Sequence, residues 1–341
     1  MYRSLLVVVA LFSLYFLQAF NSVGDLTTHE LTLLPPVVDS GHVEGGFRPV
    51  QGGIIAIVTV TGFYQTKDGP STEHDIVNAL TDLKKNGSIK GLILDLRDCH
   101  GGLLAQAVEV AGVFMKCGVV AVSKDGYSKL HFMRQLKPFP KYTGPLVILT
   151  SQHTAGAAEV VAAALQDYGL AIVVGDPETF GKRSLQPHPG KKGPFQRFYS
   201  VSGRSLQQDG VAVDIVVPSI ITSAEGKPEV YTHDSIDPSY TDALLDVPRQ
   251  GRSWFRKYYL PFMQQKTQMY TKRIPELAQV SQKRLASNTK YQQLLKGDFA
   301  VVMQEGQLQK KVLLSHEEAT KELRDMQLEE AVAITKDLLT P

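Results

Sequence analysis

One stretch, residues 151–186, constrains the fold of this chain most: SQHTAGAAEVVAAALQDYGLAIVVGDPETFGKRSLQ. The pattern predicts a turn, a buried helix, a strand and a second turn that carries one lysine. The helix begins among small residues at 154–158, runs through an apolar segment at 160–165, and ends near Tyr168 and Gly169. Small side chains let a ligand approach the free amides at the start of the helix, where the helix dipole favours a developing oxyanion. We therefore expect a site for a carbonyl group there.

The segment before this stretch alternates between apolar runs and helical patterns, which is typical of βαβ units with a parallel sheet. A helix capped by Ser71 or Thr72 and closed at Asn86 and Gly87 separates the first two strands. A second helix is expected at 103–115. Strands are expected at 54–60, 92–96, 119–122, 129–133, 146–150 and 171–174, with an exposed strand across 195–201.

The second strand ends in the turn RDCHGG, residues 97–102, and a helix follows at once. Two consecutive glycines allow the backbone to turn sharply with its amides exposed. On the residues alone, a tight turn without function explains Gly101 and Gly102 equally well.

These turns and the central helix resemble the C-terminal processing, or tail-specific, serine peptidases. In that family the helix opens on Ser/Thr-Ala-Ser-Ala-Ser/Ala-Glu, the following turn reads Thr-Phe-Gly-Lys-Gly-x-x-Gln, and the glycine turn reads Leu-Arg-Asn-Asn-Pro-Gly-Gly. The resemblance covers about residues 52–220 and implies an α/β, crotonase-like core of βαβ units that acts on protein C-termini. The matching residues around the helix and the lysine turn are Thr154, Ala155, Ala157, Ala158, Glu159, Gln166, Asp167, Tyr168, Thr179, Phe180, Gly181, Lys182 and Gln186.

The resemblance implies a role for each matching site residue. Lys182 would be the general base and Gln186 would orient it. The amides of Gly101, Gly102 and Ala157 would form the oxyanion hole, and Asp167 would support the site.

Gly156 departs from the family pattern, because it stands at the position of the nucleophilic serine. Glycine has no side-chain atom that can attack a carbonyl. Ser151, Thr154, Ser184 and the thiol of Cys99 are nearby substitutes, but even a small displacement of a nucleophile is expensive in catalysis. Three hypotheses follow: a peptide-binding pseudo-peptidase with lost or reduced hydrolysis, an active tail-specific protease with another nucleophile, and a membrane-associated scaffold.

The N-terminal segment predicts export. Arg3 precedes an apolar run at 5–20, which fits a secretory signal within residues 1–24 or an uncleaved anchor, with a bacterial periplasm as the expected compartment. Residues 25–51 predict a linker or arm. That space is too short for the PDZ domain that family members carry, so the core or an adaptor would have to recognise the tail.

The part after the core, 221–341, predicts a mainly helical C-terminal extension. Its stretch at 252–296 is rich in lysine and arginine, which suits either a peripheral membrane or partner surface or a solvated helical face, and the second is the commoner case. Ser315 and Glu318 form a capping box for the last helix.

Net charge and residue spacing bear on possible partners, cofactors and disulfides. The net charge of +2 gives no reason to expect a nucleic-acid partner, and no spacing of Cys, His, Asp and Glu suggests a metal or cofactor. Cys99 and Cys117 flank the helix at 103–115, and a helix of this length rises roughly 20 Å, too far for a disulfide. Both are expected to be free thiols.

Overall fold

The computed structural model describes residues 41–67, 69–125, 127–181, 197–206, 210–219, 235–298, 300–305 and 308–340. The apolar run at 5–20 and three candidate site residues, Lys182, Ser184 and Gln186, lie outside these described residues.

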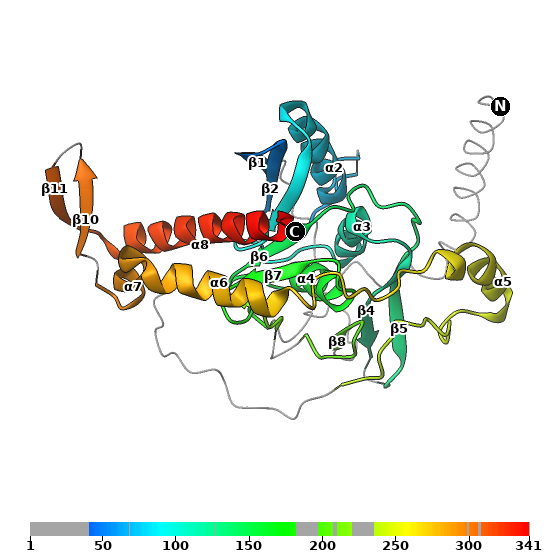
Figure 1. Cartoon of the computed structure of the whole chain (residues 1–341). Helices are drawn as coiled ribbons and strands as arrows, with labels where there is room; N and C mark the ends of the chain where they lie inside the picture. Colours follow the sequence, from blue (N-terminus) through cyan, green and yellow to red (C-terminus); the bar gives the residue numbers. More distant parts are fainter. Residues whose placement is uncertain are drawn as a thin grey trace.

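A six-stranded sheet organises the first two thirds of the chain (Figure 1). Its order is β1-β2-β3-β6-β7-β9; β1 is antiparallel to β2, and all other neighbours are parallel. The predicted α/β class is therefore confirmed. The strands are β1 (Val43–Val50), β2 (Gly53–Val60), β3 (Ile89–Asp95), β6 (Leu146–Thr150), β7 (Ile172–Gly175) and β9 (Ile215–Val216).

The strands are apolar on both sides because both faces of the sheet are covered. In β2, Ala56 and Val58 belong to one hydrophobic core, whereas Ile55 and Ile57 belong to another. The first core lies beneath α2 (Thr72–Leu83, extended by η2 at Lys84–Asn86), α3 (Leu104–Phe114) and α4 (Ala157–Asp167). Of the two predicted caps, Ser71 and Thr72, it is Ser71 that caps α2, by accepting a hydrogen bond from the His74 amide.

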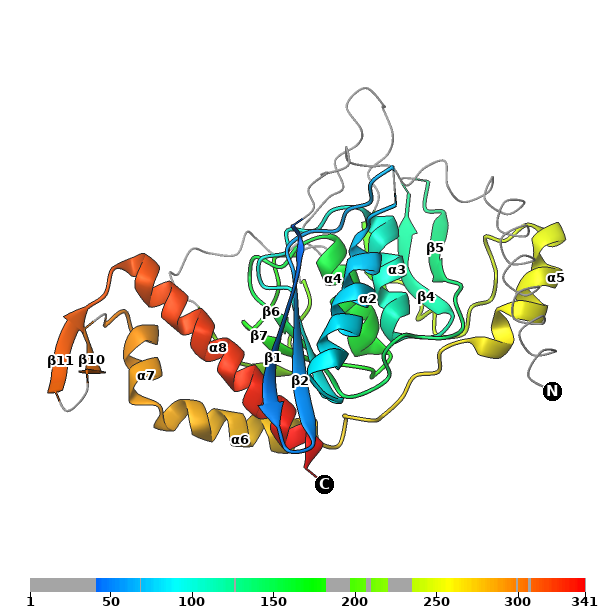
Figure 2. The same cartoon turned by 90° about the horizontal axis from the view of Figure 1, so that it is seen from above.

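The second core is covered by the C-terminal part of the chain, through α6 (Ile274–Ser287) and α8 (His316–Leu339) (Figures 1 and 2). Leu277 of α6 and Val332 of α8 are buried against the strands. The predicted capping box of Ser315 and Glu318 starts α8. The remaining elements of this part are α7 (Thr289–Leu295), β10 (Ala300–Glu305) and β11 (Leu308–Leu313).

A smaller antiparallel sheet has the order β5-β4-β8 and consists of β4 (Gly118–Lys124), β5 (Leu130–Gln135) and β8 (Arg197–Ser200). The expectation that the strand near 195–201 is exposed is wrong. Phe198, Tyr199 and Ser200 are buried, because β8 pairs with β4 and packs against α4.

The expectation of a linker over 25–51 is wrong for its last part, since β1 pairs with β2 along its whole length, from Val43 opposite Val60 to Val50 opposite Gly53. The sequence gives no strand signal here because it contains Gly45, Gly46 and Pro49, and glycine and proline are depleted in strands. An edge position tolerates them, and β1 is an edge strand.

The segment at 235–263 forms a peripheral layer that ends in α5 (Arg249–Tyr258) and η3 (Leu260–Phe262). Phe255 and Tyr259 are buried there with Cys117. Both Cys117 and Cys99 are free and buried, as predicted.

Candidate functional site

The candidate site begins at Gly156, the N-cap residue of α4. Its backbone angles are φ 61° and ψ −116°, a region that residues with a Cβ rarely adopt. The preceding residue is fixed, because the Ala155 amide donates a hydrogen bond to the Cys99 carbonyl at 2.9 Å. The nucleophile position of the family pattern therefore occupies a sharp turn at the start of a buried helix.

Glu159 joins this turn to the segment that leads to Lys182. One carboxylate oxygen accepts the Gly156 amide at 2.8 Å, and the other accepts the Thr179 hydroxyl at 2.6 Å and the Gly181 amide at 2.7 Å. The side chain is buried, so these hydrogen bonds replace its lost hydration. Glu159 thus holds the start of α4 against the residues that directly precede Lys182.

Sequence reasoning matched Glu159 to the family motif but gave it no role. The available signal was its place at the third position of the helix, where a Glu side chain reaches back to the N-cap amide in a capping box. Its second set of partners, Thr179 and Gly181, depends on tertiary structure and has no local signal.

The glycine turn lies against the start of α4. A Cβ on Gly101 would lie 2.8 Å from the Ala155 carbonyl oxygen and 3.1 Å from the Ala157 nitrogen, and one on Gly102 would lie 2.1 Å from the Phe63 carbonyl oxygen. Both residues also have positive φ, 96° and 139°. Close approach, rather than turning alone, therefore requires glycine at both positions.

Hydrogen bonds orient the Gly102 amide. Phe63 donates to the Gly101 carbonyl at 3.0 Å and accepts from the Leu103 amide at 2.7 Å, so the N–H of Gly102 between them points away from Phe63. Among the described residues, neither the Gly102 amide nor the Ala157 amide has a hydrogen-bond partner. The structure brings Gly101, Gly102 and Ala157 together beside Gly156, and the arrangement can polarise a carbonyl group.

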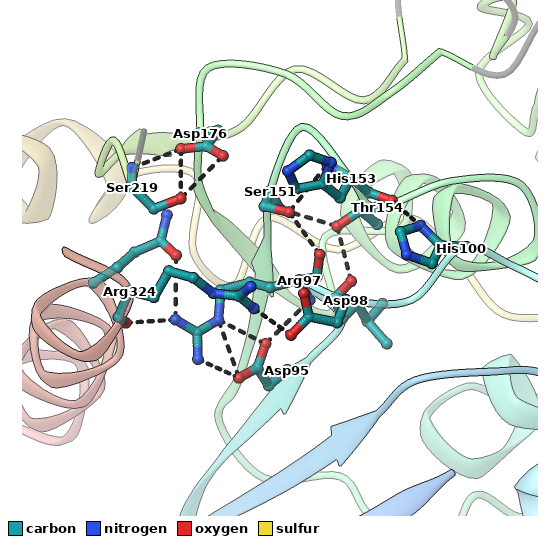
Figure 3. Close-up of polar contacts among 12 residues, drawn as sticks. Asp95, Arg97, Asp98, His100, Ser151, His153, Thr154, Asp176, Ser219 and Arg324 are labelled. Atoms are coloured by element: carbon teal, nitrogen blue, oxygen red, sulfur yellow. Dashed lines mark hydrogen bonds and ion pairs between the residues drawn. The ribbon is translucent and has the colours of Figure 1, made fainter. Parts of the chain in front are cut away.

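The described substitute nucleophiles have other tasks (Figure 3). The Thr154 hydroxyl donates to the Leu96 carbonyl at 2.8 Å, and the Ser151 hydroxyl donates to the Arg97 carbonyl at 2.6 Å. Burial raises the pKa of the Cys99 thiol to about 12, although a hydrogen bond from the Gly101 amide lowers it in part. The two hydroxyls tie the ends of β3 and β6 together. None of the three groups is placed or ionised as a nucleophile.

Asp167 lies at the opposite end of α4 from Gly156. A helix of this length separates its ends by roughly 15 Å, so the expectation that Asp167 lies near the site is wrong. Its carboxylate accepts the Ser202 amide at 3.0 Å and pairs with Arg204 at 2.8 Å, which anchors the segment after β8.

The C-terminal helix reaches the other side of the glycine turn (Figure 3). Arg97 is buried and pairs with Asp95 at 2.6 Å, and it also donates to the Arg324 carbonyl of α8. The Arg324 guanidinium pairs with Asp98. Burial raises the pKa of Asp98, but the hydrogen bond and charge of Arg324 outweigh it and hold that pKa below its ordinary value. Helix α8 thus fixes Arg97 and Asp98, the first two residues of the turn at 97–102.

Two exposed histidines stand beside this turn. The Nδ1 atom of His100 lies 3.2 Å from the His153 carbonyl oxygen, and the two rings meet edge to face. Within the described ranges, no group of three or more His, Cys, Asp and Glu side chains could hold a metal ion. In the same ranges, no helix is both long and apolar enough to cross a membrane.

Comparison with known proteins shows what the sequence is similar to. Residues 54–217 match the sequence profile of peptidase family S41. The chain is similar to the tail-specific protease of Haemophilus influenzae, with 33% identity over 193 residues, covering 52% of this chain and 27% of that protein. It is also similar to the carboxy-terminal-processing protease of Bartonella bacilliformis, with 35% identity over 157 residues, covering 43% of this chain and 36% of that protein. The matched segments span well under half the length of either relative.

The solved structures include a similar fold in the photosystem II D1 C-terminal processing protease. It is 24% identical, covers 54% of this chain and 50% of that chain, and has a TM-score of 0.44.

Proposed function

We propose that this chain, whose residues 54–217 match peptidase family S41, is an exported homologue of the C-terminal processing proteases that binds protein C-terminal tails and hydrolyses them very slowly or not at all. The observation that carries the proposal is the residue at the start of α4, which is Gly156. A Ser/Lys site needs a hydroxyl within reach of a neutral lysine, and glycine supplies none.

The loss of the nucleophile removes most of the chemistry but little of the cleft. When a catalytic serine is removed, the remaining rate comes from the oxyanion hole and from binding. Here the amides of Gly102 and Ala157 remain available among the described residues, and Glu159 still links the start of α4 to the turn before Lys182. A tail in extended conformation would place one of its carbonyls at these amides.

The second candidate is an active protease with another nucleophile. The commitment of Ser151 and Thr154 to backbone carbonyls and the raised pKa of Cys99 argue against it. Ser184, which lies outside the described residues, is the remaining candidate. Labelling with a serine-reactive probe, followed by mapping of the modified residue, distinguishes this function from the first.

Export and the choice of tail complete the proposal. The apolar run at 5–20 would direct the chain to the periplasm or anchor it at the inner membrane. Either the core itself or a separate adaptor protein would select the tails.

The test compares three proteins: the chain as it stands, Gly156→Ser, and Gly156→Ser with Lys182→Ala. Each is incubated with an unfolded protein that ends in an apolar tail, and binding of a fluorescent tail peptide is measured in parallel by anisotropy. We expect all three to bind the peptide and only Gly156→Ser to cleave. Ready cleavage by the unaltered chain would contradict the proposal, and so would failure of the chain to bind the tail.

A further inference from the structure

The basic stretch at 252–296 is not one surface in the folded chain. Arg284 of α6 pairs with Glu330 at 2.7 Å and with Asp337 at 2.6 Å, and Lys290 of α7 pairs with Glu322. All three acids belong to α8, so its carboxylates neutralise much of the basic charge of α6 and α7. The densest cluster of basic residues in and beside this stretch is instead in α5.

Helix α5 carries four cations and no acid. Arg249, Arg252, Arg256 and Lys257 line one open hollow of about 500 Å³ together with Ser253. Arg249 and Arg256 are exposed, and neither forms an ion pair with any described residue. At these two arginines the helix thus presents positive charge that no described acid neutralises.

The opposite side of α5 is fixed to the body of the protein. Phe255 is buried in a cluster with Leu244 and Val247. The Arg134 guanidinium of β5 also pairs with Asp242 at 2.5 Å and with Asp246 at 2.6 Å, which holds the segment leading into α5. The cationic side is therefore held in place before any partner arrives, and no ordering of this helix opposes binding.

Exposed apolar side chains adjoin α5 in the chain. Phe262, in η3 directly after the helix, is 39% exposed, and its ring meets that of Phe139, which is 74% exposed, at 6.4 Å between centroids. Leu245, shortly before the helix, is 70% exposed. Phe262 follows α5 closely in the chain, and basic residues combined with exposed phenylalanines are typical of surfaces that lie in the headgroup region of a bilayer, whereas an acidic polypeptide would need the cations alone.

We propose that α5, with Phe139 and Phe262, is a docking surface for an anionic phospholipid bilayer. The cations would attract the anionic headgroups and the two phenylalanines would enter the boundary of the acyl chains. This inference concerns a face apart from the α4 cleft and does not depend on tail binding or hydrolysis. It is compatible with the apolar run at 5–20, which would bring the chain to the same surface.

The test measures partition of the full chain onto vesicles of phosphatidylcholine with and without phosphatidylglycerol, by co-sedimentation at low and high salt. The test variant is Arg249→Glu with Arg256→Glu. The matched control is Lys272→Glu with Lys283→Glu, which changes the net charge equally at two exposed lysines in and before α6. Binding to the neutral vesicles reports what the apolar run contributes, and the added binding to the anionic vesicles reports the proposed surface.

We expect the α5 variant to lose the added binding by roughly two orders of magnitude, since each basic residue near an anionic membrane contributes about fivefold and each reversal also adds repulsion. The control should change it much less, and high salt should weaken it. Equal losses in both variants, or no added binding by the unaltered chain, would overturn the proposal.

A second variant separates a bilayer from an acidic protein partner. Phe139→Ser removes an exposed ring and no charge. It should weaken binding to the anionic vesicles but leave binding to polyglutamate unchanged. If polyglutamate binds more tightly than the vesicles and Phe139→Ser affects neither, the surface recognises an acidic polypeptide and the bilayer proposal is wrong.

Discussion

Glu159 accepts a hydrogen bond from the amide of Gly156 at 2.8 Å, so a side chain of α4 fixes the residue from which that helix starts. The same carboxylate accepts the Gly181 amide. A single buried group thereby joins Gly156 to Gly181, the residue that directly precedes Lys182. The contact between these two segments can be tested through this group without any assay of hydrolysis.

Replacing Glu159 with Gln should lower the free energy of unfolding by about 1.5–3 kcal/mol, because the amide cannot replace a charged acceptor that serves three donors. Urea unfolding followed by circular dichroism measures this loss. Glu276→Gln, at an exposed residue of α6, is the control and should change the value little. Similar losses in the two variants would show that Glu159 does not hold the turn.

Adding a side chain at Gly156 should cost stability whatever it does for activity. The backbone there, φ 61° and ψ −116°, is strained for any residue with a Cβ, and such strain costs about 1–3 kcal/mol. We expect Gly156→Ala and Gly156→Ser to lose similar amounts in urea unfolding. Gly46→Ala in β1, where an added Cβ meets nothing within 4 Å, should lose much less. A stabilised Gly156→Ala variant would contradict the described turn.

The two cysteines should resist alkylation in the native protein. Burial raises the pKa of Cys99 to about 12 and that of Cys117 to about 11, so at pH 8 both thiols remain neutral, and the thiolate is the reactive form. Iodoacetamide labelling counted by mass spectrometry should be slow in buffer and complete in urea. Rapid labelling of Cys99 in the folded chain would contradict its burial and would make Cys99 a candidate nucleophile again.

The buried pair of Asp95 and Arg97 should be sensitive to removal of one partner. Asp95→Ala leaves the Arg97 charge buried without its counter-ion and should cost about 3–5 kcal/mol of unfolding free energy. Asp82→Ala breaks an exposed pair with Lys85 on the surface of α2 and should cost at most about 1 kcal/mol. The ratio of the two losses, read from urea midpoints, tests whether the Arg97 site is as buried as described.

The contact between α8 and the glycine turn should weaken in acid. Arg324 holds the pKa of Asp98 below its ordinary value in the folded state, so the pair stabilises the fold above the ordinary carboxyl pKa of about 4. That stabilisation is lost as the pH falls through the lowered pKa. The stability difference between the unaltered chain and Arg324→Ala should therefore be constant near neutral pH and shrink below about pH 4. A difference that does not vary with pH would exclude the ion pair.

Sequence reasoning predicted the parallel strands and the helices between them, because a buried sheet leaves continuous apolar runs such as that of β2. It also placed the start of α2 at Ser71 or Thr72 and the start of α8 at Ser315, where the signal is local. It missed β1, whose pairing with β2 is decided by the partner strand and not by its own residues. It placed Asp167 near the site by motif alone, and the length of α4 shows otherwise.

The site was predictable where glycine is required and unpredictable where distant segments meet. Gly101, Gly102 and Ala157 do lie together, and the close approach explains both glycines. Neither the role of Glu159 toward Gly181 nor the contact of Arg324 with Asp98 has a sequence signal, because each joins residues of separate elements. The pairing of Arg284 and Lys290 had no sequence signal for the same reason, because their counter-ions lie on α8.

The second face of the sheet is covered by α6 and α8, which come last in the chain. During synthesis, when every strand of this sheet has emerged from the ribosome but α6 and α8 have not, Ile57, Ile93 and Val147 are still exposed on that face. Only when Val332 and Ile334 leave the exit tunnel can this face close. Completion of residues 54–217 therefore leaves this face open, and a nascent chain exposes it to aggregation until α6 and α8 have been synthesised and have packed on it.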